Sequence, residues 1–170
     1  MIATEPASTP SQPLCDWQTV FRDGLAPALG RAGLEALRDA LASDSPDLIQ
    51  WHTALAKGEV SAPGHESRSP GHDREPCGSA CAVGLALWRA AGLQTVGQVQ
   101  DAFRVLNERA HALLLERHGQ DVREIGNTRS RHMRFHCCQL YAFWDLTPRR
   151  AAVRQLLAEV ELALAGEATT

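Results

Sequence analysis

The residues of this chain that are best suited to chemistry are its cysteines and histidines. Cys77 and Cys81 begin the most apolar run of the sequence, which extends to Trp88. A polar loop that carries His65 and His72 precedes this run. Cysteine packs as a small hydrophobic residue and is also a soft metal ligand. The pattern therefore leaves two functions open, core packing and metal binding.

Potential ligands also occur on other segments, namely His52, His111, His136, Cys137 and Cys138. His52 lies between Leu48 and Leu55 in a predicted helix, at the middle of its apolar face. Cys81 is predicted to point into the core from a second helix. A buried imidazole needs a hydrogen-bond partner or a metal, and a buried thiol is usually inert packing. Both interpretations stay open for both residues.

His111 and Cys137 are expected to differ in their position relative to the core. The apolar stripe of the helix that carries His111 is Val99, Phe103, Leu106, Ala110 and Leu113. His111 is displaced from the centre of this stripe by roughly 120° and forms a polar shoulder with Asn107 and His118. Cys137 lines up with Leu140 and Trp144 on a deeply buried segment, where packing is the more frequent role of cysteine.

Helical periodicity dominates the chain. Start and stop signals such as Ser45-Pro46 and Gly58 predict helix boundaries. The predicted helices cover residues 16–30, 31–42, 46–57, 78–91, 95–117, about 129–144 and 148–166. An exposed polar loop is expected at 59–76. No segment shows convincing period-two alternation, so we predict an all-α fold, a helical bundle of four longer helices with additional short ones.

The composition is that of one globular domain. The chain has 170 residues, of which 44% are hydrophobic and 22% charged. We expect a disordered segment at 1–13, rich in Pro, Ser and Thr, followed by a single domain at 14–166. The net charge of −3 offers no basic excess for a phosphate backbone, so nucleic acid is not an expected partner.

The sequence predicts a cytoplasmic protein without a membrane-spanning segment. The longest apolar run, 80–88, is too short to cross a bilayer, and the N-terminus has no signal-peptide pattern. Five cysteines is an odd number, which argues against a disulfide framework and for reduced thiols.

Three stretches at compatible distances resemble the motifs of the chemoreceptor zinc-binding domain family. They are His52-Thr-Ala-Leu55, Cys81-Ala-Val-Gly84 and the helix that carries His111. The resemblance covers residues 45–118. In that family, a His precedes an aromatic residue or Leu by three positions, a Cys-x-apolar-Gly motif follows, and a later helix carries a His-x-x-x-His pair. Of this pair only His111 has a counterpart, because Asn107 and Leu115 occupy the two neighbouring positions.

The resemblance implies a helical bundle that holds zinc through His52, Cys81 and His111. A mixed His and Cys set suits tetrahedral Zn²⁺. The candidates for a fourth ligand are His118, Cys77, Cys137 and water. Such a site implies a sensor in which the thiolate responds to oxidants or to zinc, and a helix shift carries the signal.

Two functions follow from the sequence. The first is a cytoplasmic, metal-responsive regulatory or sensor domain that binds zinc. The second is an all-α module for a protein partner or self-association, in which Cys and His pack the core. We do not expect an enzyme, because the chain lacks a Cys-x-x-Cys redox pair, a phosphate-binding glycine loop and a Gly-x-Ser-x-Gly motif.

Overall fold

The computed structural model of the chain describes residues 15–64, 71–118 and 135–167. It is mostly helical, so the predicted fold class is confirmed, and it contains one small two-stranded hairpin. The helices are α1 (Trp17–Val20), α2 (Ala26–Ala42), α3 (Ala82–Ala91), α4 (Val96–His118), α5 (Phe135–Leu146) and α6 (Arg149–Glu167). A π-helical turn, η1 (Phe21–Leu25), joins α1 to α2, and a 3₁₀ turn, η2 (His72–Arg74), precedes the second strand. The strands are β1 (Ala54–Ala56) and β2 (Cys77–Ala80). The segment predicted to be disordered, 1–13, and His65 lie outside the described residues.

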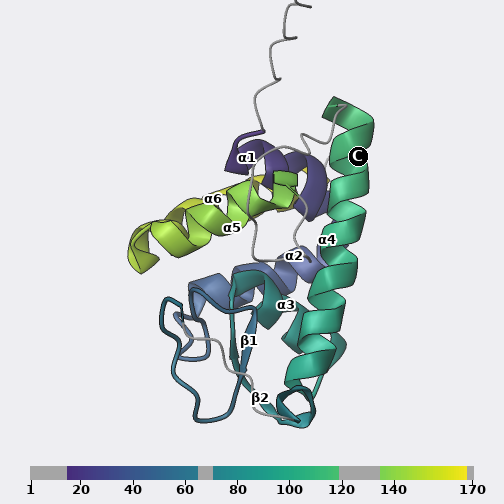
Figure 1. Cartoon of the computed structure of the whole chain (residues 1–170). Helices are drawn as coiled ribbons and strands as arrows, with labels where there is room; N and C mark the ends of the chain where they lie inside the picture. The colour runs from purple at the N-terminus through teal and green to yellow at the C-terminus, as the bar shows by residue number, and fades with distance from the viewer. Residues whose placement is uncertain (1–14, 65–70, 119–134, 168–170) are drawn as a thin grey trace, which may run out of the picture.

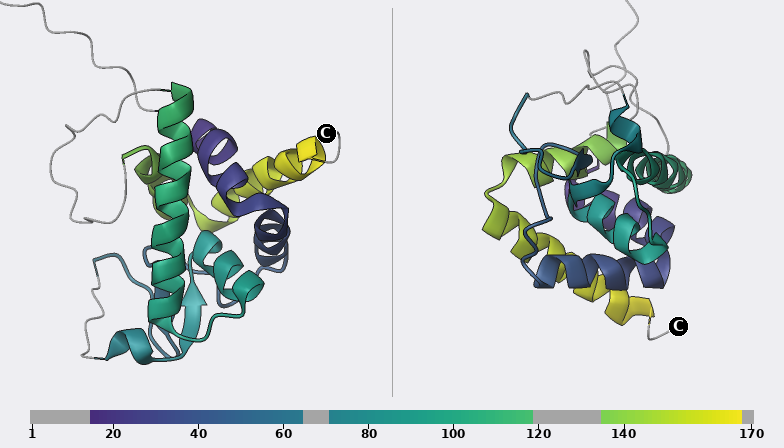
Figure 2. Two further views of the ribbon diagram at one scale, coloured as in Figure 1. Left: turned by 90° about the vertical axis from the view of Figure 1, so that its right-hand side faces the viewer. Right: turned by 90° about the horizontal axis from the view of Figure 1, so that it is seen from below.

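Helix α4 forms one side of the molecule along its whole length (Figure 1). The turn η1 packs on α4, α2 contacts both α3 and α6, and α5 contacts α1 and α4. The hairpin lies beside the N-terminal half of α4, and α5 and α6 diverge from their joining turn in a V (Figure 2). None of the described helices is long and apolar enough to cross a bilayer.

Helix α4 follows the sequence prediction closely. The hydroxyl of Thr95 accepts the N–H of Gln98 at 3.3 Å, and the side-chain oxygen of Gln98 accepts the N–H of Thr95 at 3.2 Å. This reciprocal capping box fixes the start of the helix. The predicted stripe is buried from Val99 to Ala110, and Leu114 rather than Leu113 is its fully buried continuation.

The helix predicted at 46–57 is wrong. Residues 45–53 form an irregular loop, and β1 pairs antiparallel with β2, with Ala54 opposite Ala80. Tertiary hydrogen bonds replace the helical ones in this loop. The guanidinium of Arg149 donates to the carbonyl oxygen of Leu48 at 2.6 Å, and the indole of Trp144 donates to that of Ile49 at 3.0 Å. These partners, remote in sequence, override the local start signal.

The helix predicted at 78–91 begins later than expected. Residues 77–80 form β2, so Cys77 lies in a strand, and α3 starts at Ala82 with Cys81 as its N-cap. The backbone N–H of Ala80 donates to the carbonyl of Asp47 at 2.8 Å, and that of Cys81 donates to the carbonyl of Thr53 at 3.1 Å. Pairing with the 47–53 loop therefore keeps this stretch extended.

Two histidines are more buried than predicted. His72 belongs to the stretch expected to be an exposed loop, yet it is buried within η2. His111 was placed on the polar shoulder of α4, yet only 6% of it is exposed. Because η1 and α5 pack on either side of α4, this helix buries a wider surface than the single stripe that its sequence indicates.

Candidate functional site

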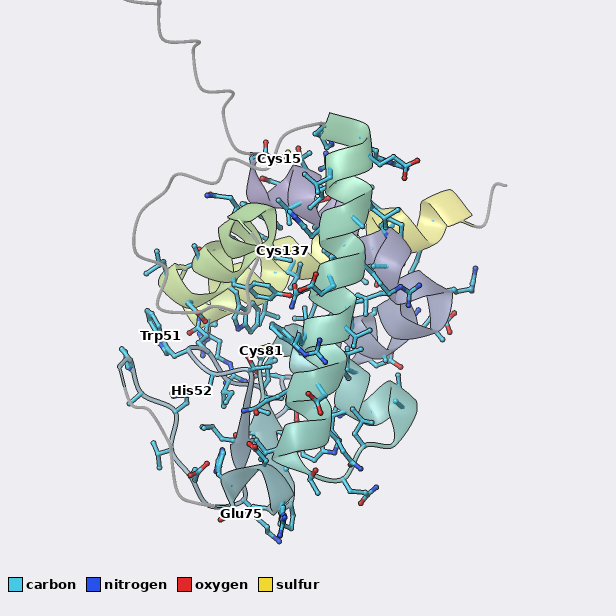
Figure 3. The ribbon with its side chains drawn as sticks, turned by 45° about the vertical axis from the view of Figure 1, so that its right-hand side comes forward. Cys15, Trp51, His52, Glu75, Cys81 and Cys137 are labelled. Atoms are coloured by element: carbon cyan, nitrogen blue, oxygen red, sulfur yellow. The ribbon has the colours of Figure 1, made fainter. Side chains whose placement is uncertain are left out.

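A cavity of about 80 Å³ brings together residues from four separate segments. We call it the central cavity. Its lining residues are Trp51, His52, Thr53, Cys81, Phe103, Tyr141, Trp144 and Asp145. They come from the 50–53 loop, the start of α3, α4 and the end of α5. Figure 3 shows Trp51 at the edge of the molecule and Cys81 near its middle, beside α4. Two of the three predicted ligands, His52 and Cys81, therefore share one cavity.

His52 lies in the loop before β1, half-buried, and not on a helix as predicted. Its Nδ1 is 3.1 Å from the hydroxyl of Ser61. That hydroxyl donates its own hydrogen to the carbonyl of Gln50, so it accepts from Nδ1–H of the ring. In the neutral imidazole only one nitrogen carries hydrogen. The lone pair is then on Nε2, the nitrogen that accepts a proton or binds a metal.

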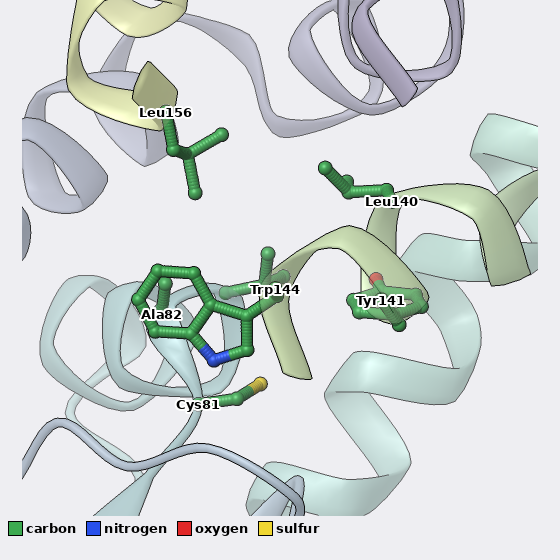
Figure 4. Close-up of a pocket in the computed structure, with 7 residues that line it drawn as sticks. Cys81, Ala82, Leu140, Tyr141, Trp144 and Leu156 are labelled. Atoms are coloured by element: carbon green, nitrogen blue, oxygen red, sulfur yellow. The ribbon is translucent and has the colours of Figure 1, made fainter. Parts of the chain in front are cut away.

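Cys81 is a buried thiol at the start of α3. Its sulfur accepts the N–H of Gly84 at 3.4 Å. Burial raises the pKa of the Cys81 thiol to about 12, a larger effect than the opposing hydrogen bond from Gly84. An apolar void of about 10 Å³, lined by Leu140 and Leu156 among others, also borders Cys81 (Figure 4). This apolar contact explains why the thiol holds its proton.

Gly84 sets the distance between α3 and the loop that carries His52. A Cβ atom at this position would lie 2.5 Å from the carbonyl oxygen of Thr53. Only glycine allows this approach without a shift of the backbone. The Cys-x-x-Gly spacing thus has a structural reason here, which is the packing of the 50–53 loop on α3.

Asp145 is the one lining residue with a carboxylate, and the sequence prediction missed it. Its Oδ1 accepts the backbone N–H of Trp51 at 2.7 Å. Burial raises the pKa of Asp145, while the hydrogen bond from Trp51 and the charge of His52 act to lower it. A single acidic residue near a helix end gives no recognisable pattern, because its partners are almost one hundred residues away in the sequence.

Trp51 has an uncommon backbone conformation. Its φ of 73° lies in the left-handed region, which costs a bulky residue on the order of 1–3 kcal/mol. The hydrogen bond to Asp145 holds this conformation. The side chain of Gln50, the preceding residue, also donates to the carbonyls of Trp144 and Thr147. The loop is therefore fixed to the end of α5, and the Trp51 ring stays at the cavity.

The third predicted ligand, His111, is not among the residues that line the central cavity. It lies on α4 two turns beyond Phe103, which does line it. Within residues 15–64, 71–118 and 135–167, no three His, Cys, Asp or Glu side chains form a group that could hold a metal ion. The described cysteines, Cys15, Cys77, Cys81 and Cys137, are free thiols.

The remaining candidates for a fourth ligand have other surroundings. His118 Nε2 is 2.7 Å from the carboxylate of Asp23, at the far end of α4. Cys137 is buried, as predicted, with its sulfur 3.9 Å from the carbonyl oxygen of Asn107. Cys77 directs its thiol to the carbonyl of Ser79 within β2. None of these three residues lines the central cavity.

No protein-family model, curated protein or solved structure matches this chain. The resemblance to the chemoreceptor zinc-binding domain family thus stays a prediction.

The central cavity has the lining of a binding site more than that of a nucleophilic centre. A thiol with a pKa of about 12 is almost fully protonated at neutral pH, and the nucleophile of a cysteine enzyme is the thiolate. A concave site with aromatic walls and a few convergent polar groups is typical of small-ligand binding. The carboxylate of Asp145 favours a ligand with positive charge.

Proposed function

We propose that this chain is a regulatory domain that binds a small positively charged ligand in the central cavity. The observation that carries the proposal is the position of Asp145. Its half-buried carboxylate is the one acidic group among the eight described lining residues, and none of these eight is Lys or Arg. Among the lining residues His52 is the one basic side chain, and its charge acts on Asp145. A partly buried carboxylate that faces no permanent positive charge in this lining favours a cation in its neighbourhood.

A regulatory role is supported by the way in which the cavity is assembled. Its walls belong to the 50–53 loop, α3, α4 and α5, so a bound ligand would contact segments that are distant in sequence. A ligand that binds one arrangement of these segments better than another shifts the population toward it. The loop before β1 is the element best placed to respond, because its backbone bonds reach α5 and α6.

The experiment is a thermal-shift titration of the whole chain with small cations, both metal ions and organic ammonium ions. A ligand at 100 times its dissociation constant raises the free energy of unfolding by about 2.7 kcal/mol. The expected result is a rise in Tm with at least one cation in the wild type and none in Asp145→Asn. The amide oxygen of this variant retains an acceptor for the N–H of Trp51, so its fold is preserved. A wild type that responds to no cation would contradict the proposal.

Zinc is a second candidate ligand, supported by the shared lining of His52 and Cys81. These two residues would supply one nitrogen and one sulfur donor, types that zinc accepts, and water would complete its coordination. The Ser61 hydroxyl at Nδ1 orients the His52 ring as an outer-shell partner does in metal sites. The burial of the thiol opposes binding, because zinc must displace its proton. When bound, zinc would supply charge that keeps the Cys81 sulfur as a thiolate.

Co²⁺ substitution tests zinc specifically, because a thiolate ligand gives cobalt a charge-transfer band. The band should appear in the wild type, weaken in His52→Ala and vanish in Cys81→Ser. The matched control is Cys77→Ser, which removes a buried thiol outside the cavity. A band that Cys77→Ser removes and Cys81→Ser keeps would assign the metal elsewhere.

A further inference from the structure

We propose that the central cavity binds a quaternary ammonium group. This inference rests on the proposed function and names the class of cation. Four of the eight lining residues are aromatic, Trp51, Phe103, Tyr141 and Trp144. The whole chain has only four Trp, four Phe and one Tyr among 170 residues. Nearly half of its aromatic side chains, including the one Tyr, therefore meet at this cavity.

Aromatic faces carry the negative part of the ring quadrupole and attract cations. An ammonium group whose hydrogens are all replaced by methyls spreads its charge over an apolar surface, and it needs no hydrogen-bond acceptors. Such a group suits walls made of rings. A metal ion or a primary ammonium would instead need several oxygen or nitrogen ligands, and the described residues form no group of three for a metal.

Asp145 supplies the charge that an aromatic enclosure alone lacks. Its carboxylate is at the cavity and is held in place by the N–H of Trp51 at 2.7 Å. The same contact ties the backbone of Trp51 to the carboxylate, and Trp51 is 40% exposed. By contrast, Phe103, Tyr141 and Trp144 are all at most 8% exposed. Trp51 is thus the exposed rim of the cavity and the other three rings are its buried walls, so a cationic head would enter beside Trp51.

Two of the rings are held by hydrogen bonds to Asn107 and Ile49, which are not among the lining residues. The Tyr141 hydroxyl donates to the side-chain oxygen of Asn107 at 2.8 Å, and the Trp144 indole donates to the carbonyl of Ile49 at 3.0 Å. Phe103 contacts Tyr141, with ring centroids 5.0 Å apart. Both polar ends of the inner rings are thus satisfied by protein groups, which leaves the apolar faces for a ligand.

The size of the cavity limits the ligand to a head group. Its volume is about 80 Å³, where one water needs about 10–15 Å³. That is room for several non-hydrogen atoms, as in a trimethylammonium group, with the rest of the ligand outside. Two sources share this chemistry, a free metabolite of the choline type and a trimethylated lysine side chain.

The test is calorimetric titration of the full chain with choline, with a trimethyllysine peptide and with 3,3-dimethylbutan-1-ol, the neutral isostere of choline. We expect an ammonium ligand to bind at least about 10-fold more tightly than the isostere. Phe103→Leu should weaken binding by about 3- to 30-fold, the range of a desolvated cation–π contact. Asp145→Asn should also weaken binding, because it removes the negative charge of the carboxylate. The control Val60→Ala, at a residue that is 77% exposed, should have no effect.

The outcomes separate the two proposals. Equal binding of choline and its isostere would overturn the aromatic-cage inference, as would the absence of binding by every ammonium ligand. If a metal ion still raises Tm in a manner that Asp145→Asn abolishes, the regulatory proposal survives that failure. Binding of the peptide without choline, or of choline without the peptide, supports the inference and identifies the source.

Discussion

The carboxylate of Asp145 accepts the backbone N–H of Trp51 at 2.7 Å, and the two residues are 94 positions apart in the sequence. This one bond joins the last turn of α5 to the loop that carries His52. It also holds Trp51 in a left-handed conformation that the residue alone would avoid. The geometry of the central cavity therefore depends on a contact between its acidic and aromatic sides.

Asp145→Asn should change the pH dependence of stability. Burial raises the folded-state pKa of Asp145 above 3.8, so the folded state binds the proton more tightly than the unfolded state. This carboxyl group therefore lowers stability as the pH rises from 3.8 through its folded pKa. The stability of Asp145→Asn relative to the wild type should increase across this window and then stay constant. Urea unfolding of both proteins at a series of pH values measures this difference in the free energy of unfolding. A difference that does not change with pH would contradict the pKa shift.

Cys81 should react much more slowly than Cys15. It is 5% exposed and its pKa is raised to about 12, whereas Cys15 is only half-buried. Since the thiolate is the reacting form, iodoacetamide at pH 7 should label Cys15 first and leave Cys81 unmodified until the chain unfolds. Mass spectrometry of the labelled peptides measures the order. Labelling of Cys81 as fast as that of Cys15 would mean that the thiol is accessible in the folded state.

Gly84→Ala should destabilise the fold and disturb the His52 loop. The new methyl would lie 2.5 Å from the carbonyl oxygen of Thr53, and overpacking of this kind costs about 1–3 kcal/mol. Gly166→Ala is the matched control, since nothing lies within 4 Å of that position in α6. Replacing glycine there should be neutral or add up to about 1 kcal/mol of helix stability. The denaturant midpoints of the two variants measure this difference in stability. Equal stabilities would rule out the tight contact between residue 84 and the carbonyl oxygen of Thr53.

Arg149→Lys should loosen the loop before His52. The guanidinium donates to the carbonyl oxygens of Leu48 at 2.6 Å and Ser45 at 3.0 Å, a forked geometry that an ammonium cannot reproduce. Loss of one such bond, about 1 kcal/mol, should accelerate amide exchange in 45–51 about 5-fold. Hydrogen exchange read by mass spectrometry tests this. Arg150→Lys, at an exposed neighbour, should leave the exchange unchanged.

The sequence was informative where local signals and tertiary contacts agree. The helix predicted at 95–117 matches α4, which runs from Val96 to His118. The helix predicted at 46–57 failed because the start signal at Ser45 and Pro46 competes with hydrogen bonds from Trp144 and Arg149. Such bonds come from residues about one hundred positions away, and no window of local sequence contains them.

The candidate site was predicted in part for a similar reason. His52 and Cys81 could be selected as chemically capable residues, and the structure brings them to one cavity. Asp145, Trp51 and Tyr141 carry no motif and became candidates only through their shared position. The expected third ligand, His111, is carried by α4 but two turns away from Phe103, at a distance along the helix of about 12 Å.

The hydrogen bonds of Gln50 and Arg149 have a consequence for synthesis on the ribosome. Loop 45–53 emerges early, yet the groups that hold it, from Trp144 to Arg149, are translated roughly one hundred codons later. A nascent chain without its final third has nothing to fix Trp51 beside a carboxylate. The central cavity is therefore a late product of translation, and a polypeptide that ends before Trp144 would lack it.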